Sequence, residues 1–354
     1  MKRTVLGILT LVVAGSIAGC TSSPAPAKDG RVHVLCSFFP MYVFTKNVVG
    51  DVKETAVELM LPAQSGCPHD YDLTPEDVKK IANADLYIMN GDGLESFGEK
   101  QVKAANSKVE IVDTSAGVEH MHHGEGSEEH DHDHAHDDKK EAEHHDHEKE
   151  GHEHAHDEHD HKHDDHDHDH GHEHGHSHEG GINPHFFSSP KRAATQVQNI
   201  CNALVKADPK HAQTYQENAA AYIAKLNALD KEFQEASKKF RRSEIVTMHE
   251  VFDYLAADCG LKVVGSIYSA PGVEPSSAEI RKLVKTIKDS KAAAVFTEPQ
   301  YPSRLGETIG KETGIPVENL DPVASGPTDP PNDYYEKKMN ENLSTLNRVL
   351  KRPE

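Results

Sequence analysis

A segment rich in histidine and acidic residues interrupts the chain between Glu119 and Glu179. It contains 23 histidines, 23 acidic residues and only 4 lysines. The segment has no apolar periodicity, so it cannot bury a core, and we expect a disordered, solvent-exposed insertion. Any fold must therefore be assembled from the sequence on the two sides of this insertion.

The composition of the insertion also predicts metal binding. Imidazole suits borderline transition metals and is largely neutral near pH 7. A solvated acidic run would account for the carboxylates but not for the histidines, so we favour zinc, with nickel and copper as alternatives. The weak, accessory ligands that we expect are His130, His132, His134, His136, His166, His168, His170, His172, His174, His176 and His178.

The charge of the chain is concentrated in the insertion. With 23 acidic residues against 4 lysines, the insertion carries −19 of the formal net charge of −21. The remaining sequence is nearly neutral and has no basic run, which argues against a nucleic-acid partner. It is long enough for two ordinary domains.

The N-terminus has the pattern of an export signal. A basic start precedes an apolar stretch, Val5 to Ala18, that is too short for a typical membrane span. It ends in Ile-Ala-Gly-Cys20, which looks like a lipobox, although an ordinary signal peptide with an incidental cysteine is the alternative. We expect a signal peptide over 1–19, acylation of Cys20, a tether over 20–30, and a lipid-anchored protein in the periplasm or at the cell surface.

Short apolar runs alternate with helix-length stretches on both sides of the insertion. The strands that we expect are Val32 to Phe39, Glu54 to Leu61, Asp85 to Met89, Val109 to Val112, Glu244 to Met248, Lys262 to Ile267, Ala292 to Thr297 and Pro316 to Leu320. This alternation predicts an α/β fold with two lobes, each built on an open, mainly parallel sheet.

Helix start signals divide the chain further. Thr74-Pro75-Glu76-Asp77 reads as a capping box, and Ser189-Pro190 opens a helix that reaches about Ala207. A second, uninterrupted helix follows from Asp208 to about Phe240 and should join the lobes rigidly. The expected divisions are a first lobe over 31–208 with the insertion at 117–181, a linking helix over 209–240 and a second lobe over 241–354.

Five histidines lie outside the insertion, and three of them share one kind of position. His69 lies in a polar loop after a strand, His185 precedes a helix cap, and His249 follows a strand directly. Ligands of open α/β sheets bind beyond the carboxyl ends of strands. His33, within a strand, and His211, in a first helical turn, are expected to be structural.

Three imidazoles from separate segments suit a preformed zinc site with a fourth position for carboxylate or water. Taken singly, each histidine could instead be structural. For the fourth ligand we favour Asp321 at a strand end, with Glu298 as a weaker candidate. Glu250, beside His249, could orient an imidazole from outside the ligand shell or simply begin a helix.

Five motifs resemble a known family. They are Pro68-His69-Asp70-Tyr71-Asp72-Leu73-Thr74-Pro75, Asn183-Pro184-His185, His249-Glu250-Val251-Phe252-Asp253-Tyr254, Pro271-Gly272-Val273-Glu274-Pro275-Ser276 and Phe296-Thr297-Glu298-Pro299-Gln300. Together they resemble the metal-specific substrate-binding proteins of ABC importers over about residues 31–350. The histidine at the third motif and the His-rich insertion resemble the zinc-binding, ZnuA-like branch.

The resemblance implies a function and a set of partners. It implies a monomer of two α/β lobes that captures Zn²⁺ with His69, His185 and His249, completed by Asp321 or water. The ion would then pass to an ABC permease driven by its ATPase. Cys67 departs from the family pattern; it would be either disulfide-bonded or a thiolate that competes for zinc. The pairing among Cys36, Cys67, Cys201 and Cys259 stays open.

Three other functions remain as alternatives. In a metal-buffering or adhesin lipoprotein, the insertion would be the functional element. Manganese or iron uptake would require a shell richer in oxygen ligands. A zinc hydrolase is disfavoured, because the sequence has no HExxH motif and no clearly placed general base beyond Glu250. We therefore expect a transport protein rather than an enzyme.

Overall fold

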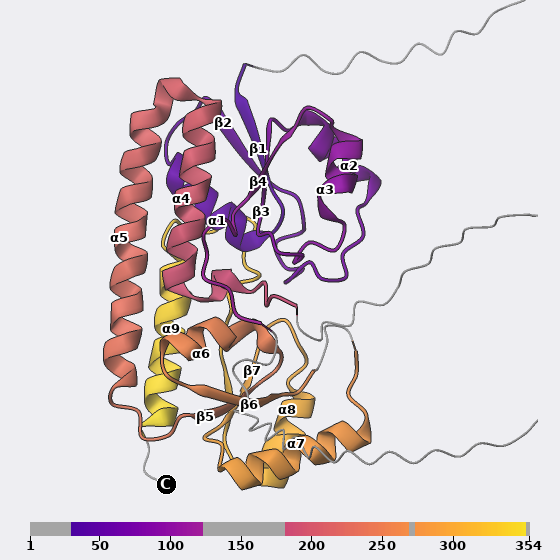
Figure 1. Cartoon of the computed structure of the whole chain (residues 1–354), viewed down its shortest axis with the longest axis vertical. Helices are drawn as coiled ribbons and strands as arrows, with labels where there is room; N and C mark the ends of the chain where they lie inside the picture. The colour runs from indigo at the N-terminus through magenta and orange to yellow at the C-terminus, as the bar shows by residue number, and fades with distance from the viewer. Residues whose placement is uncertain (1–29, 123–180, 269–272, 352–354) are drawn as a thin grey trace, which may run out of the picture.

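The computed structural model describes residues 30–122, 181–268 and 273–351. Cys20 and the eleven accessory histidines of the insertion lie outside the described residues. Figure 1 shows two α/β lobes, one above the other, with helix α5 running alongside both. This is the predicted fold class.

The first lobe is built on a four-stranded, fully parallel sheet with the order β2-β1-β3-β4. Its strands are β1 (Val32–Cys36), β2 (Thr55–Leu59), β3 (Leu86–Met89) and β4 (Glu110–Asp113), and its helices are α1 (Phe39–Val49), α2 (Pro75–Asn83) and α3 (Gly98–Ala105). The capping box of α2 forms as predicted. Helix α3 was not predicted; it is short, and no side chain caps its N-terminus.

The second lobe repeats this plan with the order β6-β5-β7-β8. Its elements are β5 (Glu244–Thr247), η3 (Glu250–Phe252), α6 (Asp253–Asp258), β6 (Lys262–Ser266), α7 (Ser277–Ser290), β7 (Val295–Thr297), α8 (Arg304–Thr313), β8 (Val317–Asn319) and α9 (Tyr334–Leu350). Each predicted strand is present. Seven of the eight are one to three residues shorter than predicted, and β4 has the predicted length but lies one residue further along the chain.

A helical pair joins the lobes. It comprises η1 (Phe186–Ser188), α4 (Pro190–Ala207), η2 (Pro209–His211) and α5 (Ala212–Ser237). Helix α4 has the predicted limits, and the Ser189 side chain caps it by accepting from the backbone N–H of Arg192. The next helix begins with a 3₁₀ turn, so α5 has 26 residues and is about 39 Å long at ~1.5 Å per residue.

The lobes are connected by more than this helix. Side chains from both lobes and from α5 and α9 form one continuous apolar core, which includes Phe44, Tyr222, Leu255 and Tyr335. The segment between β8 and α9 also returns to the first lobe, where the backbone N–H of Gly326 donates to the Ala63 carbonyl at 2.9 Å. The lobes are therefore joined on one side by several packed segments, which favours small relative movements.

Nothing in the described part of the chain is a candidate for crossing a membrane: its helices are too short or too polar.

Candidate metal centre

Four potential metal ligands from both lobes meet between the sheets. One ligand atom from each of Cys67, His69, His185 and His249 lies within 4.8 Å of every other. Cys67 and His69 lie in the connection after β2, His185 precedes α4, and His249 follows β5. The parallel topology brings these connections together, because the carboxyl ends of the strands share one edge of each sheet.

Hydrogen bonds hold the loop that carries His69 at residues before and after the histidine. The Pro68 carbonyl accepts from the Ser96 hydroxyl at 3.3 Å, and the same hydroxyl lies 2.9 Å from the Tyr71 carbonyl. The Tyr71 hydroxyl donates to Asp77, the carboxylate of the α2 capping box, at 2.8 Å. His69 thus enters the cluster from a loop fixed by a helix cap, and its Nε2 lies 2.9 Å from His185 Nε2.

Asn183 orients His185. Its side-chain oxygen accepts from His185 Nδ1 at 2.7 Å, and because an amide oxygen only accepts, Nδ1 carries the proton and Nε2 faces the cluster. The side-chain nitrogen of Asn183 donates to the Glu250 carbonyl at 2.9 Å and to the Asp253 carboxylate at 3.2 Å. One amide therefore ties the His185 turn to the segment that follows His249.

Glu298 orients His249 in the same way. His249 is only 3% exposed, and its Nδ1 lies 2.8 Å from Glu298 Oε1. Burial alone would lower the pKa of His249, but the charge and hydrogen bond of Glu298 outweigh it and raise that pKa. The opposite nitrogen, Nε2, is buried without a hydrogen-bond partner among the described residues. Buried polar atoms in this state are rare, and a bound ion is one of the few arrangements that account for them.

The thiol of Cys67 is the fourth member of the cluster. Burial, together with the charges of Glu298 and Glu95, raises the pKa of Cys67 well above its ordinary value of 9.0. No disulfide forms among the four cysteines of the described ranges. The other three cysteines (Cys36, Cys201 and Cys259) are buried.

Asp321 does not belong to this group of four within the described residues. One of its carboxylate oxygens accepts from the Val323 backbone N–H at 2.9 Å, and the other lies 3.8 Å from Lys338 Nζ. Burial is the largest influence on Asp321 and raises the pKa of its carboxyl group. Its role as the fourth ligand stays a prediction. The Glu250 side chain is also outside the group.

The buried carboxylate of Glu95 is linked to the cluster through Asn90. Glu95 is 2% exposed and accepts from the Ser37 hydroxyl at 2.7 Å and from the backbone N–H groups of Asn90 and Gly91 at 2.8 and 3.3 Å. The Asn90 side chain in turn donates to the Pro184 carbonyl at 2.8 Å, next to His185. No sequence pattern predicted this role, because the β3–α3 connection has the pattern of an ordinary polar loop.

A family comparison agrees with this geometry. The sequence model described as "Zinc-uptake complex component A periplasmic" matches residues 34–349. The chain belongs to the ZnuA family. The resemblance found in the sequence motifs is therefore confirmed.

Relatives of this ZnuA-family chain carry names that refer to zinc. It is 33% identical over 317 residues to the high-affinity zinc uptake system protein ZnuA of Bacillus subtilis (strain 168), covering 89% of this chain and 86% of that protein. It is 31% identical to the zinc-binding lipoprotein AdcA of Streptococcus pneumoniae serotype 4, covering 92% of this chain. The match spans only 56% of AdcA, so it corresponds to part of that protein.

Solved structures share the fold. The Zn(II)-bound ZnuA-like domain of Streptococcus pneumoniae AdcA is 27% identical, with a TM-score of 0.64 and coverage of 91% of this chain and 100% of that one. The substrate-binding protein FpvC of Pseudomonas aeruginosa with Ni²⁺ is 25% identical, with a TM-score of 0.68 and coverage of 92% and 99%.

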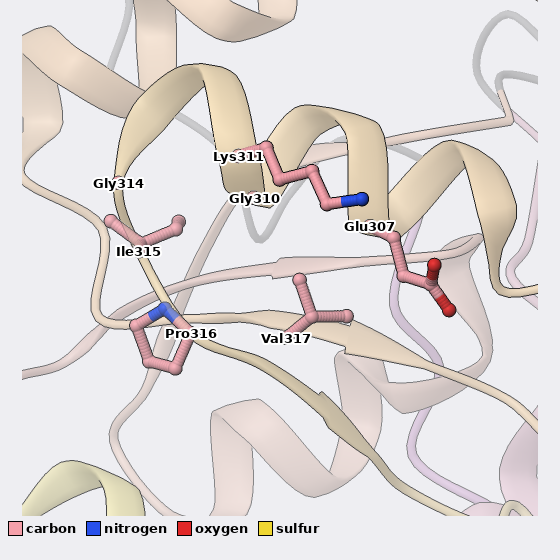
Figure 2. Close-up of a pocket in the computed structure, with 7 residues that line it drawn as sticks. All are labelled: Glu307, Gly310, Lys311, Gly314, Ile315, Pro316 and Val317. Carbon is pink, nitrogen blue, oxygen red and sulfur yellow. The ribbon is translucent and has the colours of Figure 1, made fainter.

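The ZnuA-family chain also has a surface hollow of about 540 Å³ between α8 and β8. Figure 2 shows Glu307 and Lys311 on the helix, facing Ile315, Pro316 and Val317. The loop from α8 enters the amino end of β8, so the hollow lies at the opposite sheet edge from the histidines. Its lining contains no histidine or cysteine, and we assign it no role in metal binding.

Proposed function

We propose that this chain is the substrate-binding protein of a zinc importer and captures Zn²⁺ between its lobes. The convergence of three imidazoles from both lobes carries the proposal. Asn183 and Glu298 hold the Nδ1 atoms of His185 and His249, so that the opposite nitrogen of each ring, Nε2, could bind an ion. This arrangement is typical of metal-binding histidines, whose second nitrogen donates to a carboxylate or carbonyl.

The composition of the cluster favours zinc. Nitrogen and sulfur donors suit Zn²⁺, whereas manganese prefers carboxylate, carbonyl and water oxygens. Zinc–nitrogen distances of about 2.0–2.1 Å place tetrahedral ligand atoms ~3.3 Å apart. The Nε2 atoms of His69 and His185 lie 2.9 Å apart, and all ligand atoms of the cluster lie within 4.8 Å of one another. Side-chain movements on the order of 1 Å would therefore be enough to bind an ion.

The sharing of ligands between lobes supports a delivery mechanism. His69 and His185 precede α5, whereas His249 and Glu298 belong to the second lobe. Opening of the lobes on a membrane permease, driven by its ATPase, would remove His249 from the shell and weaken the remaining site. The apolar core shared by both lobes, α5 and α9 favours a small rotation over a wide opening.

The proposal places the protein outside the cytoplasm with a lipid anchor on Cys20. The apolar leader and the Ile-Ala-Gly-Cys20 sequence support it, as does the name of the lipoprotein AdcA. The bound metal is cargo, and the family is that of a transport component, so we infer transport without catalysis.

The His-rich insertion would act as a zinc collector. Its two ends are adjacent, because His122 and Ile182 form an antiparallel bridge and the Asn183 N–H donates to the Met121 carbonyl at 2.9 Å. Both ends therefore lie within a few residues of His185. Zinc that dissociates from the insertion would be released beside the cluster.

Competitive titration with a zinc chelator tests the capture site. The full chain is compared with a variant in which a short glycine linker replaces 123–181 and with His69→Ala. We expect one tight zinc site in the first two proteins and its loss in His69→Ala. Only weak zinc binding after removal of the insertion would instead support the buffering or adhesin function.

Zinc uptake by cells tests delivery. Removal of the coding gene should lower uptake from zinc-poor medium, and the His69→Ala protein should fail to restore it. Unchanged zinc uptake with reduced manganese or iron uptake would assign the chain to one of those metals.

A further inference from the structure

We propose that the Cys67 sulfur is the fourth ligand of the captured zinc, giving a shell of three imidazoles and one thiolate. The inference rests on the proposed function, because it assigns the remaining position of the same site. It also gives a physical basis for selection of zinc over manganese.

The position of the sulfur carries the proposal. It lies within 4.8 Å of a nitrogen from each of the three histidines. Zinc–sulfur distances of about 2.3 Å and zinc–nitrogen distances of about 2.0 Å place tetrahedral sulfur and nitrogen atoms ~3.5 Å apart. The sulfur–nitrogen distances would therefore have to shorten by on the order of 1 Å for all four atoms to bind one zinc ion, which is within the reach of side-chain rotation.

A second observation points to a ligand in the same space. The Nε2 atom of His249 is buried and has no partner among the described residues, although Glu298 holds the other nitrogen of the ring. An orphaned buried nitrogen is costly, and a metal ion bound to it would remove that cost. The sulfur and this nitrogen would then share one ion.

The backbone holds Cys67 in place. Gly66 has φ +77, a conformation that other residues rarely adopt, and a Cβ there would lie 3.2 Å from the Gln300 side chain. On the other side, Pro68 restricts the backbone of Cys67 and accepts the hydrogen bond from Ser96. The thiol therefore sits on a braced turn that contacts the connection between β7 and α8.

Two neighbouring carboxylates have contacts of their own. One oxygen of Glu298 is held by His249, and Asp321 accepts from the Val323 N–H with Lys338 nearby. Neither carboxylate belongs to the group of ligand atoms that lie within 4.8 Å of one another, whereas the sulfur of Cys67 does.

Coordination by the thiolate changes both the charge of the site and its relative affinity for different metal ions. The sulfur–hydrogen bond breaks, its proton passes to bulk water and the sulfur–zinc bond forms, with no change of oxidation state. The thiolate neutralises one of the two positive charges of the ion. Thiolates favour zinc and disfavour manganese, so Cys67→Ser should lower the ratio of zinc to manganese affinity at least about tenfold.

Cobalt(II) tests this directly in the full chain carrying Cys20→Ala. The insertion has many histidines but no cysteine, so a thiolate-to-cobalt charge-transfer band would report a cysteine ligand. We expect this band at one equivalent of cobalt and its loss in Cys67→Ser and Cys67→Ala. Cys201→Ser, which changes a buried cysteine of α4, is the matched control and should keep the band.

The outcomes separate this inference from the proposed function. A site that binds cobalt stoichiometrically without the band, or with an equal band in Cys67→Ser, would overturn the thiolate ligand. If His69→Ala still abolishes tight zinc binding in that case, zinc capture stands and only the role of Cys67 fails. Tight zinc binding that survives His69→Ala would overturn both. Circular dichroism and thermal unfolding of each variant show whether it is folded.

Discussion

The two lobes place a buried glutamate at equivalent positions but use it differently. In the first lobe Glu95, after the third strand, accepts from Ser37, after the first strand, at 2.7 Å. In the second lobe Glu298, after the third strand, pairs with His249, after the first strand, at 2.8 Å. The sheets have the same strand order, so the pairs occupy corresponding places.

The two carboxylates differ in how many of their oxygens accept a hydrogen bond. Three donors surround Glu95, and each of its oxygens accepts a hydrogen bond. Glu298 has one oxygen on His249, while its other oxygen and the His249 Nε2 are buried without partners among the described residues. A complete set of hydrogen bonds thus accompanies the structural pair, and an incomplete set accompanies the pair that we propose takes part in metal binding.

The largest effect should follow replacement of the imidazole itself. His249→Ala removes one of three nitrogen ligands, so zinc affinity should fall about 100-fold or more, or ~3 kcal/mol. Chelator competition measures this fall. His211→Ala is a suitable control, because His211 lies 2.6 Å from Asp208, outside the cluster, and its loss should leave zinc affinity unchanged. Equal losses in both variants would contradict the assignment.

The glutamates provide the second test. Glu298→Gln keeps the size of the side chain but weakens the hydrogen bond from His249, and changes of this kind lower metal affinity by about 10–100-fold. Glu95→Gln should instead change mainly the free energy of unfolding and lower zinc affinity less than Glu298→Gln does, since the Glu95 carboxylate contacts no histidine of the cluster. A similar loss of zinc affinity in both variants would remove the distinction between the lobes.

Asn183→Ala should have a smaller effect on zinc. Without its amide, His185 loses the acceptor for Nδ1, and the link to the Glu250 carbonyl is also lost. We expect a decrease of about 10-fold in zinc affinity by isothermal titration. Asn199→Ala, which removes two hydrogen bonds to carbonyls at the start of the β4 connection, is the control and should bind zinc normally.

The smallest effect on zinc affinity is expected for Ser37→Ala, which should change stability instead. Burial raises the pKa of Glu95 above its ordinary value of 4.5, whereas the Ser37 hydrogen bond opposes this shift. Removal of that bond leaves a buried carboxylate short of a donor, which costs about 1–3 kcal/mol at neutral pH. Urea unfolding of metal-free protein measures the cost.

The pH dependence of this cost has a definite sign. A carboxyl group with a raised pKa binds its proton more tightly in the folded protein, so protonation favours the folded state as pH falls through the folded pKa. Without Ser37 that pKa rises further. The stability difference between wild type and Ser37→Ala should therefore shrink as pH falls through the folded pKa of Glu95 toward 4.5. A difference that grows with acid would contradict this account.

Local sequence signals predicted most of the fold. Strand-length apolar runs, the Thr74 capping box and the Ser189-Pro190 helix start depend on neighbouring residues and therefore appear directly in the sequence. Helix α3 escaped prediction because it lacks a capping side chain and is only 8 residues long. The three histidines were likewise identified by their places at loops and strand ends.

Tertiary structure decided how those histidines are supported and what joins them. The contacts of His249 with Glu298 and of Asn183 with Glu250 link residues 49 and 67 positions apart, which no local periodicity encodes. From the sequence we favoured Asp321 as the fourth ligand, whereas the fold brings the Cys67 sulfur among the imidazoles. The sequence thus determined which side chains reach the carboxyl ends of the strands. Only the packing of two sheets against shared helices decided which of them meet, because that depends on distances between lobes.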